Sequence, residues 1–191
     1  MSGFVHTSHT HDGDLAVFLI GMRVNQPWRP DLWVPVLGAM PGMIAELYRA
    51  KDAAARGEGP DLGFLEARTL LGAGGPTVVQ YWRDADAIYA YANDPDRLHR
   101  PAWTAFYRRS RRATGAVGIW HETYAVPAGA HESLYVAMPP TGLGKAFGLT
   151  QDRSRRRHAA LRRRRDGAAA GAGAAAGAAG TAAEVADVPG P

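Results

Sequence analysis

Residues 64–82 read FLEARTLLGAGGPTVVQYW, and this stretch decides the fold. Its centre, GAGGP at 72–76, is a cluster of turn-forming residues. The following TVVQYW at 77–82 is rich in β-branched and aromatic residues, which is typical of a strand. Residues 64–71 have mixed helix and strand propensity. We interpret them as a strand, because a strand there could pair with 77–82 across the glycine turn. The stretch therefore predicts a β-hairpin.

Toward the N-terminus, the sequence predicts one strand and one helix. Residues 16–25, AVFLIGMRVN, are apolar on both alternating faces, as in a strand that is covered on both sides. A helix is expected after Asp31, a suitable N-cap, because apolar residues recur at spacings of three and four over 32–48. Pro41 is expected to kink or split this helix. Residues 50–61 are predicted to be a loop.

Toward the C-terminus, two helical segments and a strand follow the hairpin. Asp84 is a predicted N-cap for a helix that is interrupted at 93–95, the sequence Asn-Asp-Pro. A second helical piece is expected over 98–112, with its apolar residues on one side and arginines in its last turn. Residues 117–126, VGIWHETYAV, predict a strand, and 132–136 predict a short final one.

The order strand, helix, strand, strand, helix, strand is the split β-α-β-β-α-β arrangement of a ferredoxin-like α+β fold. Helices would cover one face of this sheet, yet the strands are apolar on both faces. Pairing two sheets face to face in a homodimer would cover the second face. We therefore expect a dimeric α+β barrel.

Composition limits the class of protein. The chain has 191 residues, of which 46% are hydrophobic and 21% charged, as in an ordinary soluble domain. Without cysteine, the sequence cannot form disulfides, a thiolate nucleophile or an iron–sulfur cluster. The longest apolar stretch, residues 15–22, is too short to span a membrane, and no signal-peptide pattern begins the chain. These features predict a cytoplasmic protein without a membrane partner.

Three segments divide the chain: a disordered polar segment at 1–14, the folded domain at 15–149, and a disordered tail at 150–191. Basic and acidic residues balance up to residue 150, so the net charge of +4 comes from eight arginines against four acids in the tail. The tail continues into Ala and Gly. It has three interpretations: an arm that binds nucleic acid, a solvated extension, or a translation of the wrong reading frame. Since no aromatic residue interleaves the arginines, nucleic-acid binding is not expected.

Several catalytic motifs are absent. An H-E-x-x-H zinc motif starting at His121 fails, because its fifth position is Ala125. GLGK at 142–145 lacks the rest of a phosphate-binding loop, and GAG at 72–74 precedes a strand rather than the helix of a dinucleotide site. No G-x-S-x-G is present. We expect no metal site, and interpret the N-terminal histidines as a solvated polar segment: His6, His9 and His11.

The predicted catalytic residues are polar groups on two strands. His121 faces away from its strand neighbours and is a candidate general base, or a haem ligand. Arg23 and Asn25 share one face of the first strand, where Arg23 is a candidate for stabilising an enolate or superoxide-like charge. The structural alternatives are an ordinary interior histidine and an ion pair of Arg23 with Glu66 or Glu122.

An aromatic-walled cavity with a few polar groups would suit a flat hydrophobic ligand. The structural alternative for the tryptophans is ordinary core packing, and for His99 it is packing against Trp103, four residues away on one helical face. The candidate substrate-binding residues are Trp82, His99, Trp103, Trp120 and Tyr124.

Five sequence blocks stand out: FLIGMRVN at 18–25, QYWR at 80–83, HRPAW at 99–103, GIWHETY at 118–124 and MPPTGLGK at 138–145. Together they resemble a largely uncharacterised monooxygenase-like family that is grouped with the antibiotic-biosynthesis monooxygenases. The resemblance covers residues 15–148 and implies the dimeric ferredoxin-like barrel. In better understood relatives, a substrate that readily forms a carbanion reacts with O₂ without metal or flavin, and some members occur in secondary-metabolite pathways. No established catalytic residues carry over from the family.

The leading hypothesis is a cofactor-independent monooxygenase that acts on a hydrophobic aromatic or polyketide-like molecule with O₂. His121 would be the base, and Arg23 and Asn25 would orient the substrate oxygen. One alternative is a haem enzyme of the same superfamily, with His121 or His99 as the axial ligand. Another is a dimer that binds a small molecule without converting it.

Overall fold

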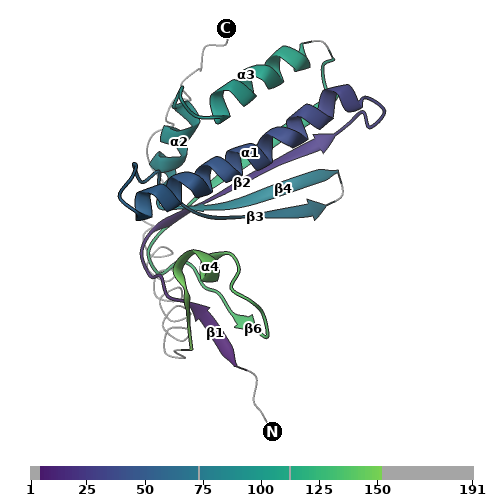
Figure 1. Cartoon of the computed structure of the whole chain (residues 1–191). Helices are drawn as coiled ribbons and strands as arrows, with labels where there is room; N and C mark the ends of the chain where they lie inside the picture. Colours follow the sequence, from purple (N-terminus) through teal and green to yellow (C-terminus); the bar gives the residue numbers. More distant parts are fainter. Residues whose placement is uncertain (1–4, 73, 112, 152–191) are drawn as a thin grey trace, which may run out of the picture.

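Four strands form an antiparallel sheet in the order β3-β4-β2-β5. The structure, a computed structural model, describes residues 5–72, 74–111 and 113–151. Three helices connect the strands and lie on one face of the sheet (Figure 1). This strand order and these connections make the ferredoxin-like α+β topology that the sequence predicts. The elements are β2 (Leu15–Val24), α1 (Pro30–Ala55), β3 (Phe64–Gly72), β4 (Gly75–Trp82), α2 (Ala85–Asn93), α3 (His99–Ser110) and β5 (Val117–Val126).

The helix α1 is longer than the sequence patterns predict. It is a single helix that includes Pro35 and Pro41, so the prediction that Pro41 could split it is wrong. Each proline removes only one backbone hydrogen bond, and the flanking turns of a 26-residue helix hold it together. The prediction of a loop from residue 50 is also wrong, since the strong helix formers of 50–55 extend α1. The helix ends before Gly57, whose φ is +71°.

The β3–β4 hairpin is confirmed, and its turn requires glycine. Gly72 pairs with Gly75 across the turn. Gly75 has a φ of +150°, and a Cβ on it would lie 2.1 Å from the carbonyl oxygen of Met22. No side chain fits there, because the hairpin end approaches the backbone of β2.

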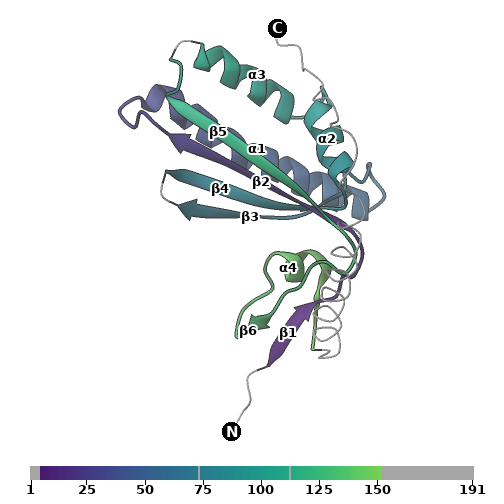
Figure 2. The ribbon, with the colours of Figure 1, turned by 180° about the vertical axis from the view of Figure 1, so that it is seen from behind.

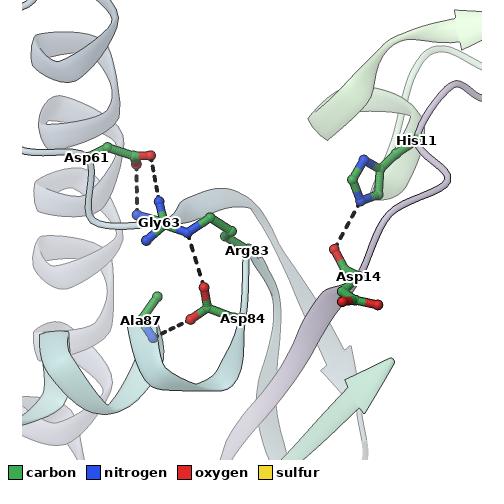
Figure 3. Close-up of polar contacts among 7 residues, drawn as sticks. All are labelled: His11, Asp14, Asp61, Gly63, Arg83, Asp84 and Ala87. Carbon is green, nitrogen blue, oxygen red and sulfur yellow. Dashed lines mark hydrogen bonds and ion pairs between the residues drawn. The ribbon is translucent and has the colours of Figure 1, made fainter. Parts of the chain in front are cut away.

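The predicted N-cap of α2 is also confirmed (Figure 3). The Ala87 backbone N–H donates to Asp84 Oδ1 at 2.7 Å, and this bond is the main reason that the pKa of Asp84 is lowered. Arg83 donates to Asp84 at 3.1 Å and to Asp61 Oδ2 at 2.9 Å. Asp61 Oδ1 in turn accepts the Gly63 N–H at 2.8 Å. The network joins the start of α2 to the loop before β3.

The core lies between the sheet and the helices. Ala16, Phe64 and Trp82 from three adjacent strands pack there with residues of α1 and α2. Trp82 is fully buried, and its Nε1–H donates to Gln80 Oε1 at 2.9 Å. Tyr91 of α2 donates to Glu46 of α1 at 2.8 Å, which ties the two helices together.

A second, three-stranded sheet lies beyond one end of the first sheet (Figures 1 and 2). Its central strand is β1, which pairs antiparallel with both neighbours. The prediction of disorder for 1–14 is therefore wrong for β1. A local pattern cannot reveal a four-residue strand whose partners lie far along the chain. The sheet contains β1 (His6–His9), β6 (Tyr135–Val136) and β7 (Leu149–Thr150), and α4 (Leu143–Phe147) precedes β7.

Two of the N-terminal histidines predicted to be solvated instead pack in or beside the small sheet. His9 is buried, and its Nε2 lies 2.8 Å from His131 Nδ1, while its Nδ1 lies 2.6 Å from Ser133 Oγ. Burial, followed by the neighbouring histidines, lowers the pKa of His9. His11 stacks on Phe147 at 4.0 Å and hydrogen-bonds to the Asp14 carbonyl (Figure 3). The disordered tail predicted at 150–191 is wrong for Thr150, which belongs to β7, and residues 152–191 lie outside the described residues.

The face of the large sheet opposite the helices carries no helix in the described part of the chain (Figure 2). Trp120 and Tyr124 of β5 are exposed there, at 40% and 51%, as is Leu70 of β3.

Among the described helices, none combines the length and the apolar character that crossing a bilayer requires.

Candidate active site

A cavity of about 890 Å³ lies between α1, α3 and the helix-covered face of the large sheet. Its floor includes Ile20 and Met22 of β2, which pair with Val78 and Ile119 of the neighbouring strands. Because residues alternate along a strand, these four side chains point to the helix face together. The rest of the wall comes from residues 35–45 of α1 and from α3.

Small residues of α1 leave room for the cavity. Gly38, Gly42 and Ala45 recur at spacings of four and three and all line it. A Cβ on Gly38 would meet no described atom within 4 Å outside its own helix backbone, and one on Gly42 would meet only Leu98, at 3.9 Å. The space between α1 and α3 therefore follows from the side-chain sizes on α1.

His99 lies on the cavity wall with one ring nitrogen already engaged. It is the first residue of α3, and its Nδ1 lies 3.0 Å from the carbonyl oxygen of Ala92. A carbonyl only accepts, so Nδ1 carries a proton and Nε2 of the neutral ring is a basic lone pair. Within the described structure Nε2 makes no hydrogen bond. The ring stacks against Trp103, with centroids 6.2 Å apart.

Aromatic side chains of α3 form one wall of the cavity. Trp103 is 39% exposed, and its ring centroid lies 5.9 Å from that of Phe106 and 4.8 Å from that of Tyr107. Trp103 and Phe106 both line the cavity. A flat apolar ligand would find an aromatic surface there.

A hydrogen-bonded network that sequence analysis did not find supports the opposite wall. Tyr48 of α1 lines the cavity, and its hydroxyl donates to Glu66, whose side chain is buried. Lys145 of α4 donates to the same carboxylate at 2.9 Å. Burial, and then the bond to Glu66, raises the pKa of Tyr48. Glu66 thus pairs with Lys145 rather than with Arg23, and a partner 79 residues away gives no local signal.

The structure brings only two of the sequence-predicted site residues, His99 and Trp103, to the cavity. Trp82 belongs to the core instead. His121 does point to the helix face, but β5 is an edge strand, so the side chain is exposed and contacts Phe18, with ring centroids 5.6 Å apart. It does not line the cavity.

The other predicted residues lie elsewhere. Arg23 and Asn25 are exposed at the end of β2, where Asn25 Nδ2 donates to the Gly115 carbonyl at 2.9 Å. Trp120 lies over Gly21 on the helix-free face. Tyr124 is on the same face and donates to Glu122 at 2.6 Å. These residues do not form one site with His99.

Comparison with known proteins identifies the family. The model of the "Monooxygenase af470-like" family matches residues 15–143, about two-thirds of the chain. The chain belongs to the monooxygenase af470-like family. The matched range of this af470-like domain runs from β2 to the start of α4 and includes every residue that lines the cavity. The family resemblance inferred from the sequence blocks is thereby confirmed.

One curated relative of the af470-like domain is the "Monooxygenase af470" of Aspergillus fumigatus. The two are 28% identical over 149 residues, which is 73% of this chain and 49% of the relative. The chain thus spans about half the length of the curated relative that it matches.

Solved structures with partial likeness include two bacterial proteins. SnoaB, described as a cofactor-independent oxygenase from Streptomyces nogalater, is 16% identical with a TM-score of 0.39, covering 59% of this chain and 92% of that one. Rv0793 from Mycobacterium tuberculosis is 17% identical with a TM-score of 0.37, covering 58% and 93%. The fold assignment above rests on strand order and connections, independently of these values.

Proposed function

We propose that the af470-like domain is a monooxygenase that oxidises a hydrophobic aromatic or polyketide-like molecule with O₂, without metal or flavin. The observation that carries this proposal is the position of the His99 ring. Its Nδ1 is hydrogen-bonded to a backbone carbonyl, and its Nε2 is left as a base on the wall of a largely apolar cavity of about 890 Å³. Such a cavity suits a polycyclic ligand, and a positioned imidazole suits proton abstraction.

The proposed reaction begins with removal of a proton from an acidic C–H group of the substrate by His99. The carbanion transfers one electron to O₂, and the resulting radical pair combines into a C–O bond, which gives a peroxide anion. The protonated histidine returns its proton to that anion. Where the carbon was a CH₂ group, loss of water leaves a ketone, so one oxygen atom enters the product and the other leaves as water. The substrate supplies all the electrons.

His99 replaces His121 as the proposed base, because only His99 lines the cavity. Trp103 is proposed to stack against the bound ring system, and Tyr48 to close the opposite wall. Arg23 and Asn25, which lie outside the cavity, have no role in this proposal.

The test is oxygen consumption with anthrone-like and quinol-like substrates by the purified protein and two matched variants. His99→Ala is expected to lower the rate at least about a hundredfold, the usual contribution of a general base. His121→Ala is the control and is expected to keep the wild-type rate. Loss of turnover in His121→Ala alone would show that His121, not His99, is the base. Substrate binding without oxygen uptake by the wild type would favour a non-catalytic binding protein.

A haem enzyme is the second candidate, because the same cavity is large enough for a macrocycle and His99 Nε2 points to no other partner among the described residues. An absorption spectrum of the freshly purified protein separates the two. A strong band at about 400 nm, the region of haem absorption, would rule out the cofactor-free proposal and favour axial ligation of haem by His99.

We also propose that the domain is a homodimer formed through the helix-free face of the large sheet. Trp120, Tyr124 and Leu70 expose apolar surface on that face. A second copy placed against it would bury these side chains from both chains at once, since a two-fold interface uses the same patch twice.

A further inference from the structure

Arg109 lines the same cavity as His99, but from the other end of α3. Ten residues separate the two, which at 1.5 Å per residue places them about 15 Å apart along the helix. The Leu98 N–H donates to Glu46 at 3.2 Å and so places the His99 end against the middle of α1. Since α3 runs back along α1 in the opposite direction (Figure 1), the Arg109 end lies toward the first turns of α1. The cavity is therefore elongated, with a base at one end and a cation at the other.

Among the described residues, Arg109 has no ion-pair partner. Its side chain is half-buried. The helix α3 contains no acidic residue, so no neighbour one turn away can pair with it. Of the described residues that line the cavity, none is acidic either. A partly desolvated guanidinium beside apolar walls favours a bound anion, because the anion replaces lost hydration.

We infer that the cavity takes an elongated apolar organic anion, whose carboxylate or similar oxyanion is bound by Arg109 while its far end reaches His99. A fused tricyclic or longer ring system with a short acidic side chain has the required length and shape. The guanidinium fork matches a carboxylate with two parallel hydrogen bonds, which orients the molecule along the cavity. That the far end of the ligand reacts at His99 rests on the proposed function, whereas binding of its anionic end rests on Arg109 alone.

The test uses two probes with the same ring system and side-chain length, the anionic 1-pyrenebutyric acid and its uncharged methyl ester, titrated against the purified full chain by pyrene fluorescence. The wild type is expected to bind the acid at least about tenfold more tightly, the effect of a charged hydrogen-bonded pair. Arg109→Met is expected to bind both probes equally, and Arg109→Lys to keep part of the preference. Arg108→Met is the control, since Arg108 is the exposed neighbour outside the cavity wall, and it should keep the full preference.

Three results would overturn the inference: equal affinity of the wild type for acid and ester, a preference that survives in Arg109→Met, or binding of neither probe. The experiment measures binding only, so its failure is distinguishable from failure of the oxygenase proposal. His99→Ala is expected to lose oxygen consumption and still prefer the acid. If the wild type consumes no oxygen but shows the Arg109-dependent preference, the anion site stands and the proposed reaction falls.

Discussion

At the scale of single residues, Tyr48 connects three separate segments of the chain. Its hydroxyl donates to Glu66 and accepts the Ala67 backbone N–H at 3.2 Å, while Lys145 donates to the same carboxylate. Glu66 is only 3% exposed, so its charge depends on these donors rather than on water. The network therefore stabilises the β3 edge and one wall of the cavity together.

Tyr48→Phe is expected to lower the free energy of unfolding by about 2 kcal/mol, because it leaves a buried carboxylate and a backbone N–H each short of a partner. Urea denaturation measures the loss. The matched control is Tyr89→Phe, since Tyr89 is 57% exposed and is expected to tolerate the change with little effect. Equal stability of the two variants would contradict a supporting role of the network.

At the scale of secondary-structure elements, the start of α2 is fastened by charged side chains (Figure 3). Asp84 accepts the Ala87 N–H, and Arg83 links Asp84 to Asp61. The arginine contacts are exposed and contribute little by themselves. The cap is the important part, because a helix N-terminus has unpaired N–H groups that this carboxylate satisfies.

Asp84→Ala is expected to cost about 1 kcal/mol at pH 7, the usual effect of losing an N-cap. The folded-state pKa of Asp84 lies below its ordinary value, so the charged cap stabilises the protein fully at pH values above the unfolded-state pKa of about 3.9. This stabilisation is lost as the pH falls through the lower folded pKa. The difference between wild type and variant should therefore shrink below about pH 4 in thermal melts. A stability cost of Asp84→Ala that does not change with pH would contradict a role of the Asp84 charge in the cap. Asp86→Asn, in the same first turn, is the control.

At the scale of the whole molecule, the two faces of the large sheet have different environments. One is covered by α1, α2 and α3, and the other carries no helix in the described chain (Figures 1 and 2). Trp120 lies directly over Gly21 on this second face, since a Cβ at that position would lie 2.5 Å from Trp120 Nε1. The tryptophan, 40% exposed, presents an apolar surface to the proposed second copy.

Trp120→Glu is expected to convert the dimer to a monomer, since it places two carboxylates in a desolvated two-fold interface. Sedimentation-velocity ultracentrifugation would show the mass halved. Val34→Glu is the control: Val34 is 48% exposed on α1, on the other side of the sheet, and its variant should keep the dimer mass. A wild type that sediments as a monomer at micromolar concentration would contradict the proposal.

Local patterns were sufficient to predict the central fold. The hairpin at 64–82, the cap at Asp84 and the strand at 117–126 each carry their own turn, capping or alternation signal, and all are found in the structure. The small sheet could not be predicted in this way. Its strands have two to four residues and are defined by distant partners rather than by periodicity.

The candidate site was less accessible from the sequence because it depends on how elements pack. Alternation correctly separates His121 from Trp120, but it does not say what covers an edge strand. The spacing of His99 and Trp103 places them on one helical face, yet only the packing of α3 against α1 shows that this face lines a cavity. Arg109 resembled an ordinary arginine in the last turn of a helix.

The central position of β1 in the small sheet determines the order in which the chain can fold. His6 pairs with Val136 and His9 with Leu149, so each contact closes a loop of well over a hundred residues. Closing such a loop in the unfolded chain is entropically costly, and it becomes cheap only when the large sheet has already brought both ends together. We therefore expect the small sheet to assemble last and to open first. Amide hydrogens of β1 should exchange with solvent sooner than those of β2 and β4.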